Sequence, residues 1–202
     1  MRLFVFVVTL AIGIVAVSPV LPAQADTTPP FEIVFPQEVA ETQFSSTYGA
    51  LRSGGRRHNG NDLMAPRLTE VYAVGDGTVI HVGVNRLSGR NVKIEHAEGW
   101  TSYYLHLNND NIGTDDGRAD WTLTVAPAIE VGMPVKAGQL IAWVGDSGNA
   151  EGTTPHTHFE LRSNGRPINP YSILRDAFER GWHVEERLAA SLVPAPGDYE
   201  IE

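Results

Sequence analysis

The chain contains no cysteine. This absence excludes disulfide bonds, a thiol nucleophile, cysteine-ligated zinc and a lipid attached to a cysteine after export. Basic side chains are also scarce, because 15 Lys and Arg stand against 24 Asp and Glu and give a formal net charge of -9. A protein that binds nucleic acid needs a basic patch, which this composition does not supply. We therefore expect no nucleic-acid partner.

Long apolar runs are equally rare, and the one that stands out lies at the N-terminus. Residues 3–17 are apolar, follow Arg2 and precede the small-x-small pattern Ala23-Gln24-Ala25. The run is shorter than the roughly 20 apolar residues that a membrane span requires. Residues 1–25 are thus interpreted as a cleaved secretory signal. The expected product is an exported monomer in the periplasm, the cell wall or the extracellular space, with no stable membrane span.

The rest of the 202 residues suits one domain with short extensions. Residues 26–43 begin with a proline-rich segment and are predicted to form an extended lead-in. Residues 44–170 contain short apolar and β-branched runs separated by glycine, which is typical of an antiparallel β domain. The predicted strands are 71–74, 78–84, 91–96, 101–107, 121–125, 139–144 and 156–162.

One helix is predicted after the β domain. Asn169 can cap it, Pro170 suits its first position, and apolar residues recur at helical spacing beyond them. Gly181 is predicted to end this helix, and residues 185–190 fit a second short turn. We assign residues 171–202 to a helical extension and tail that pack outside the β core.

Histidines supply the first candidates for chemistry. His58 and Asp62 lie four positions apart in a stretch rich in Asn and Gly, so their side chains would converge through a loop or bend and not along a helix. Both residue types are good zinc ligands. Taken alone, such a pair is more typical of a turn with a solvated side chain, and a metal site needs a third ligand.

A second candidate is the His156-Thr157-His158 run. Strand alternation places both histidines on one face, roughly 6 to 7 Å apart, with Thr157 and Phe159 on the other face. The two imidazoles can both hold a metal, or one can hold it while the other handles protons, and spacing leaves these alternatives open. His106 ends an aromatic run, where a lone histidine is more often structural.

Three short motifs follow one another along the chain. They are His58-x-x-x-Asp62, Tyr104-Leu105-His106-Leu107 and Pro155-His156-Thr157-His158-Phe159-Glu160-Leu161-Arg162. In this order they resemble the motifs of lysostaphin/LytM-like zinc metallopeptidases, and the similarity extends over residues 44–170. The resemblance implies a mainly β fold, an antiparallel β-sandwich of the duplicated-hybrid-motif type, with the site in a groove.

Position by position, the resemblance implies that His58, Asp62 and His158 ligate one zinc ion. It also implies that His106 and His156 act beside the metal without binding it. Three protein ligands leave a fourth position for water, whose pKa zinc lowers to about 7. We expect His106 and His156 to orient this water, move its proton and stabilise the oxyanion, without ranking either as the principal base.

The resemblance, the export signal and the complete ligand set predict a zinc metalloendopeptidase that hydrolyses stem or cross-bridge peptides of bacterial peptidoglycan in wall remodelling or lysis. One alternative is a catalytically silent member that binds the wall or activates an amidase, although silent relatives typically lack metal ligands. Another is a zinc endopeptidase that acts on secreted or host proteins. Residues 108–128 depart from the family pattern and are predicted to form a solvated loop or hairpin near the groove, without the ligand spacing of a calcium loop.

Overall fold

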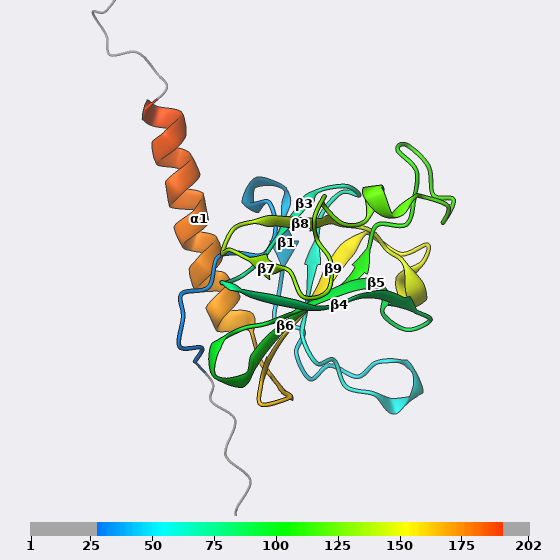
Figure 1. Cartoon of the computed structure of the whole chain (residues 1–202), viewed down its shortest axis with the longest axis horizontal. Helices are drawn as coiled ribbons and strands as arrows, with labels where there is room; N and C mark the ends of the chain where they lie inside the picture. The colour runs from blue at the N-terminus through cyan, green and yellow to red at the C-terminus, as the bar shows by residue number, and fades with distance from the viewer. Residues whose placement is uncertain (1–27, 192–202) are drawn as a thin grey trace, which may run out of the picture.

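The computed structural model describes residues 28–191, and their side chains as far as residue 181. The expected signal at residues 1–25 and the tail beyond residue 191 lie outside the described part. Short strands and single 3-10 turns alternate along the chain before one long helix (Figure 1). The strands are β1 (Gln43–Phe44), β2 (Asn61–Met64), β3 (Glu70–Tyr72), β4 (Gly77–Asn85), β5 (Gly89–Glu95), β6 (Trp100–Leu107), β7 (Pro134–Val135), β8 (Leu140–Trp143), β9 (His156–Ser163) and β10 (Arg166–Ile168).

The strands form two antiparallel sheets. The larger sheet has the order β1-β2-β9-β6-β5-β4-β7, with β10 also paired to β9, and the smaller one consists of β3 and β8. β9 therefore lies between β2 and β6, although β2 precedes it by almost a hundred residues. The predicted mainly antiparallel β fold is confirmed.

One hydrophobic core joins the two sheets. Val71 of β3 and Ala142 of β8 belong to the same buried cluster as Val92 of β5 and Phe159 of β9. Alternation along each strand explains this arrangement, since every second side chain points toward the opposing sheet. The other face of the larger sheet is left for polar side chains.

Residues 121–125 were predicted to form a strand, and this prediction is wrong. Trp121–Leu123 form a 3-10 turn, and only Val125 makes an isolated β-bridge. The Asp120 side chain accepts a hydrogen bond from the Thr122 backbone N–H at 2.9 Å. This local cap offers the backbone an alternative to strand pairing, which the apolar pattern does not reveal.

The C-terminal helix α1 (Tyr171–Ser191) is longer than predicted, because it continues through Gly181. A Cβ atom at Gly181 would lie 2.9 Å from Cγ2 of Val39, so the glycine permits close packing and does not end the helix. Good helix formers such as Glu, Arg, Leu and Ala follow it in the sequence, which sustains the helix. Among the described residues, no helix has the length and apolar character needed to cross a membrane.

The helix and the N-terminal lead-in both contribute to the core. Leu174 and Ala177 of α1 are buried in the main cluster, so the expectation that the helix packs outside the core is wrong. Phe178 packs edge-on against Phe35, with ring centroids 5.0 Å apart. Figure 1 shows α1 along one side of the sandwich with the lead-in beside it. The amphipathic pattern did predict the helix, but not which surface its apolar side covers.

Burial favours the neutral form of His96, just after β5, and both of its ring nitrogens have hydrogen-bond partners. Its Nδ1 donates to the Asp76 carbonyl at 2.8 Å, and its Nε2 lies 2.8 Å from the Ser102 hydroxyl. Because a carbonyl oxygen only accepts, Nε2 of the neutral ring accepts the Ser102 hydroxyl proton. Burial lowers the pKa of His96 below its ordinary value, although the Asp76 contact opposes this shift.

This lowered pKa predicts a pH-dependent stability. The unfolded chain, where the pKa of histidine is about 6.5, binds the proton more tightly. The stabilisation is complete above that value and is lost as pH falls from about 6.5 toward the folded pKa. Urea unfolding at about pH 7.5 and about pH 5.5 should show a smaller loss for His96→Gln than for the parent chain. Equal losses would contradict the assignment.

Candidate metal centre and active site

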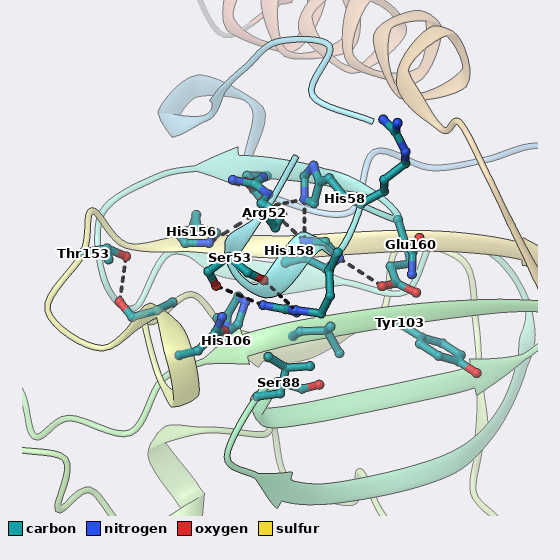
Figure 2. Close-up of a pocket in the computed structure, with 18 of the residues that line it drawn as sticks. Arg52, Ser53, His58, Ser88, Tyr103, His106, Thr153, His156, His158 and Glu160 are labelled. Atoms are coloured by element: carbon teal, nitrogen blue, oxygen red, sulfur yellow. Dashed lines mark hydrogen bonds and ion pairs between the residues drawn. The ribbon is translucent and has the colours of Figure 1, made fainter. Parts of the chain in front are cut away.

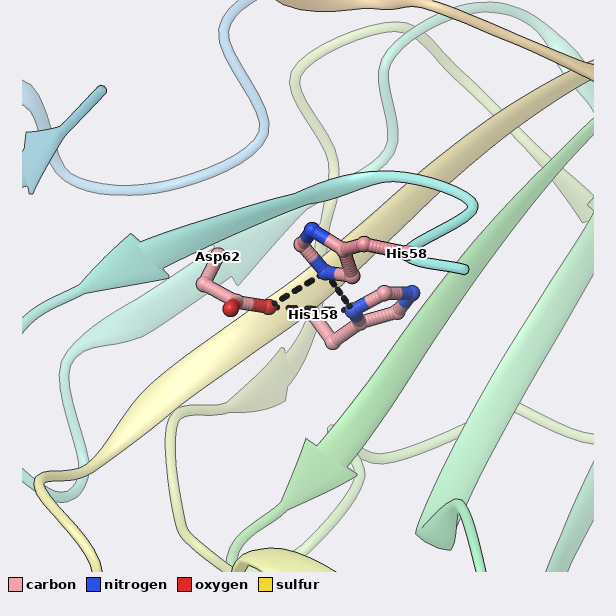
Figure 3. Close-up of side chains that lie close together, drawn as sticks. All are labelled: His58, Asp62 and His158. Carbon is pink, nitrogen blue, oxygen red and sulfur yellow. Dashed lines mark hydrogen bonds and ion pairs between the residues drawn. The ribbon is translucent and has the colours of Figure 1, made fainter. Parts of the chain in front are cut away.

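Strand pairing brings the predicted ligands together (Figure 3). Asp62 on β2 is the register partner of His158 on β9, and the loop before β2 places His58 beside them. His58 Nε2 lies 3.0 Å from Asp62 Oδ1 and 2.8 Å from His158 Nδ1. His158 Nδ1 is also 3.0 Å from Asp62 Oδ1. Two imidazole nitrogens and one carboxylate oxygen therefore converge, with each of the three atoms at most 3.0 Å from the other two.

The outer nitrogens of both rings are held by hydrogen bonds. His58 Nδ1 donates to the Thr47 carbonyl at 2.9 Å, and His158 Nε2 donates to Glu160 Oε1 at 3.1 Å. Neutral rings held in this way direct their unprotonated nitrogens toward each other and toward Asp62. Three converging lone pairs repel unless a cation or a proton lies among them. This donor set, with its second layer of hydrogen bonds, fits a zinc ion.

The charge balance of the triad also suits a cation. Burial raises the pKa of Asp62, but hydrogen bonds with His158 and His58 outweigh burial and leave that pKa far below its usual range. For His158, burial lowers the pKa, while Asp62 and Glu160 outweigh it and raise the pKa above its usual value. The second oxygen of Asp62 forms an ion pair with Arg52. The carboxylate thus remains ionised and available as a ligand.

His156 and His106 lie beside the triad. His156 Nε2 is 4.0 Å from Asp62 Oδ1, and the His156 and His106 ring centroids are 5.2 Å apart. Each Nδ1 donates to a backbone carbonyl, of Thr154 at 2.8 Å for His156 and of Ser147 at 2.9 Å for His106. Nε2 of each neutral ring is therefore left to accept a proton. Burial lowers the pKa of His106 to about 4, so this ring is neutral at neutral pH.

A β-bulge turns His106 toward the groove. Tyr104 is buried in the core, so regular alternation along β6 would place His106 on the core side as well. The register between β5 and β6 shifts at this point, and His106 adopts a φ of 62° in the left-handed region. Leu105 and His106, which are neighbours in the chain, both line the groove. The bulge thus re-aims the side chain, as bulges near active sites often do.

These histidines line an open groove of about 810 Å³ (Figure 2). One wall is the polar face of β9, where His156, His158, Glu160 and Arg162 occupy alternate positions. The prediction that His156 and His158 share a face is confirmed. Sequence reasoning missed Glu160, although the same alternation places it on this face two residues after His158.

Comparison with known proteins places this geometry in a family. The sequence profile described as Peptidase family M23 matches residues 56–118 and 121–170, which is more than half of the chain. The chain belongs to peptidase family M23. The matched regions of this M23 chain include the three residues of the triad and both neighbouring histidines. The resemblance to lysostaphin/LytM-like peptidases is thereby confirmed.

Curated relatives match about two thirds of this chain. The M23 chain is 32% identical over 136 residues to the DD-carboxypeptidase/endopeptidase Mpg of Neisseria meningitidis, which spans 65% of this chain and 27% of that protein. It is 34% identical over 140 residues to the peptidoglycan DD-endopeptidase ShyB of Vibrio cholerae, which spans 67% of this chain and 28% of that protein. The match thus spans little more than a quarter of each relative's length.

Solved structures agree with the fold. A zinc-containing peptidase from Vibrio cholerae is 30% identical, with a TM-score of 0.55 over 68% of this M23 chain and 39% of that chain. The catalytic domain of lysostaphin from Staphylococcus simulans is 26% identical, with a TM-score of 0.52 over 68% of this chain and 95% of that one. The fold of the β domain is therefore shared with these two peptidases.

Residues 108–128 of the M23 chain are buried at their base and exposed at their tip. Arg67 joins this stretch to the groove wall, with ion pairs to Asp110 at 3.0 Å, Asp115 at 2.8 Å and Asp146 at 2.7 Å. Asn108 and Asp110 are buried, so the prediction of a simply solvated loop is wrong at the base. The ion pair with Arg67 neutralises the buried Asp110 carboxylate. No residue of this stretch is among the described residues that line the groove.

Proposed function

We propose that the chain is a zinc-dependent metalloendopeptidase that hydrolyses peptide bonds in the stem or cross-bridge peptides of bacterial peptidoglycan. The observation that carries the proposal is the convergence of His58 Nε2, Asp62 Oδ1 and His158 Nδ1 within the groove. Membership in family M23 supports the reaction class. Relatives named as peptidoglycan DD-endopeptidases support the substrate class.

In this proposal His58, Asp62 and His158 hold the zinc ion. When bound, zinc supplies Lewis acidity at an open coordination position and lowers the pKa of water there to about 7. His156 and His106 are placed to accept, on Nε2, the proton that the attacking water loses and to pass it to the leaving amine. Their Nδ1 hydrogen bonds to backbone carbonyls keep both rings in the tautomer that this role needs.

The location follows from the sequence and the substrate class. Residues 1–25, interpreted as a secretory signal, direct the chain to the periplasm, the cell wall or the outside of the cell, where peptidoglycan lies. Residues 44–170 carry the peptidase site. The described part of α1 extends the core of that domain.

Digestion of purified peptidoglycan tests the proposal. The exported chain should release fragments whose masses correspond to cut peptide bonds, with the sugar chains intact. A zinc chelator should stop the release, and added zinc should restore it, because the triad is the sole holder of the metal in this scheme. Mass spectrometry of the fragments names the bond. Failure to cut any peptide bond with one zinc ion bound per chain contradicts the proposed activity.

A further inference from the structure

We infer that Lys93, Tyr103 and Arg162 form an anion-binding subsite in the groove, which binds a carboxylate of the peptide substrate. The inference rests on the proposed function and adds a specificity determinant to it. These three side chains lie on neighbouring strands β5, β6 and β9, and all of them line the groove. Tyr103 is the register partner of Lys93, and Thr101 on the same strand is the partner of Arg162.

Basic side chains are concentrated in the groove of an acidic chain. The chain as a whole has a formal net charge of -9. The groove nevertheless contains more basic than acidic side chains, which favours an anionic ligand and attracts it from a distance. The basic residues that line it are Arg52, Arg56, Arg57, Lys93 and Arg162, and the acidic ones are Asp62 and Glu160.

Both acidic groups in the groove are already engaged. Asp62 belongs to the metal triad, where it also pairs with Arg52. Glu160 accepts a hydrogen bond from His158 through Oε1, and its Oε2 lies 2.6 Å from Arg162 Nη2. Among the described residues, no carboxylate lies within 4.0 Å of Lys93 Nζ. The positive charge of Lys93 therefore has no counter-ion in the groove.

Two cations pack against the Tyr103 ring. Lys93 Nζ lies 4.6 Å from the ring centroid, and Arg162 Cζ lies 4.6 Å from it as well. Because β6 lies between β5 and β9, the two cations approach Tyr103 from the strands on either side. Each contact is favourable by itself, but only Arg162 also has a carboxylate partner, which is Glu160. A substrate carboxylate near Lys93 completes this charge balance.

Strand geometry places the subsite at a defined distance from the metal triad. Lys93 pairs with Tyr103, and Tyr103 pairs with Glu160, two residues after His158. Two residues along β9 at about 3.3 Å each, and two strand spacings of about 4.8 Å, give a separation of roughly 12 Å. An extended peptide advances by a similar length per residue. The carboxylate recognised here thus belongs to a group about four residues, or an equally long side branch, away from the bond that is cut.

Two synthetic substrates and one substitution test the subsite. The substrates are a cross-linked dimer of peptidoglycan stem peptides with free carboxylates and the same dimer with its carboxylates converted to primary amides. Lys93→Gln should raise KM for the free-carboxylate dimer by roughly tenfold, as expected for the loss of one charge-assisted contact, and leave kcat nearly unchanged. Its KM for the amidated dimer should equal that of the parent chain. Lys93→Arg, which keeps the charge, should behave as the parent.

Lys136→Gln is the matched control, because Lys136 is an exposed lysine outside the groove, paired with Asp76. It should change neither substrate's KM. Equal KM values for the two dimers in the parent chain, or an equal rise in KM for both dimers in Lys93→Gln, overturn the subsite and leave the peptidase function standing.

If the parent chain cuts neither dimer, the proposed function fails, and calorimetric binding of both dimers to the zinc-loaded chain decides the subsite. In that experiment, a tenfold tighter binding of the free-carboxylate dimer that is lost in Lys93→Gln supports the subsite. Equal affinity of the parent chain for the two dimers overturns it.

Discussion

The His58→Ala variant is expected to lose both its zinc and its peptidase activity. His58 supplies one of only three converging donor atoms, and its ring is fixed by the Thr47 carbonyl. Alanine leaves two ligands, which hold zinc weakly in competition with protons. Cleavage should fall by about a thousandfold or more, because the activation of water and the stabilisation of transition-state charge that zinc would supply at these three ligands are lost. Zinc per chain from elemental analysis and fragment release from peptidoglycan measure the two losses.

His156→Ala separates catalysis from metal binding. This residue lies beside the triad and outside it, so zinc should remain bound while cleavage falls by about 10²- to 10⁴-fold, the usual contribution of a positioned acid or base. His81→Ala is the matched control, because His81 on β4 is not among the residues that line the groove, and it should change neither quantity. Loss of zinc from His156→Ala would reassign this histidine as a ligand.

The second large effect concerns stability. Arg67→Met is expected to lower the free energy of unfolding by about 3–5 kcal/mol, the usual cost of removing one partner of a buried ionic network. The Asp146 side chain is 0% exposed and that of Asp110 is 1% exposed, so neither carboxylate can turn to water when the guanidinium is gone. Asp146 also accepts a hydrogen bond from the Gly152 backbone at 3.1 Å, so the groove wall should loosen. Urea titration followed by tryptophan fluorescence measures the loss.

Arg175→Met provides the comparison for this variant. Arg175 is 57% exposed and pairs with the exposed Glu179 on α1, so its loss should change stability by about 0.5 kcal/mol or less. Adding Asp110→Asn and Asp146→Asn to Arg67→Met should recover part of the stability, because uncharged amides cost less when buried. If Arg67→Met is no worse than Arg175→Met, the network does not hold residues 108–128 in place.

Local patterns in the sequence predicted those parts of the site that depend on local geometry. Alternation along one strand is enough to place His156 and His158 on the same face, and the motif order identified the family. The roles of these residues remain predictions that the variants above address. His106 shows the limit, since alternation assigns it to the core side and only the shifted β5–β6 register turns it into the groove.

Two of the remaining misses originate in tertiary contacts. Gly181 resembles a helix stop by its type, yet its role depends on the position of Val39, more than a hundred residues earlier. Asp110 looks solvated in the sequence until Arg67, more than forty residues earlier, is placed beside it. The 3-10 turn at residues 121–123 is the exception, because its Asp120 cap is a local contact that the sequence does contain and that the apolar pattern masked. Single-sequence reasoning weighs propensities and cannot see such partners.

The position of β9 between β2 and β6 has a consequence for the order of events in folding. Asp62 and His158 are separated by 96 residues in the chain, so the triad closes only when a strand from near the end of the domain inserts beside one from its beginning. Pairings over such long separations form late and slowly. A chain still emerging from synthesis, and ending before residue 156, lacks half of the histidines in the groove. All three donor atoms of the triad come together only after β9 has paired with β2, so metal capture reports that this long-range pairing has formed.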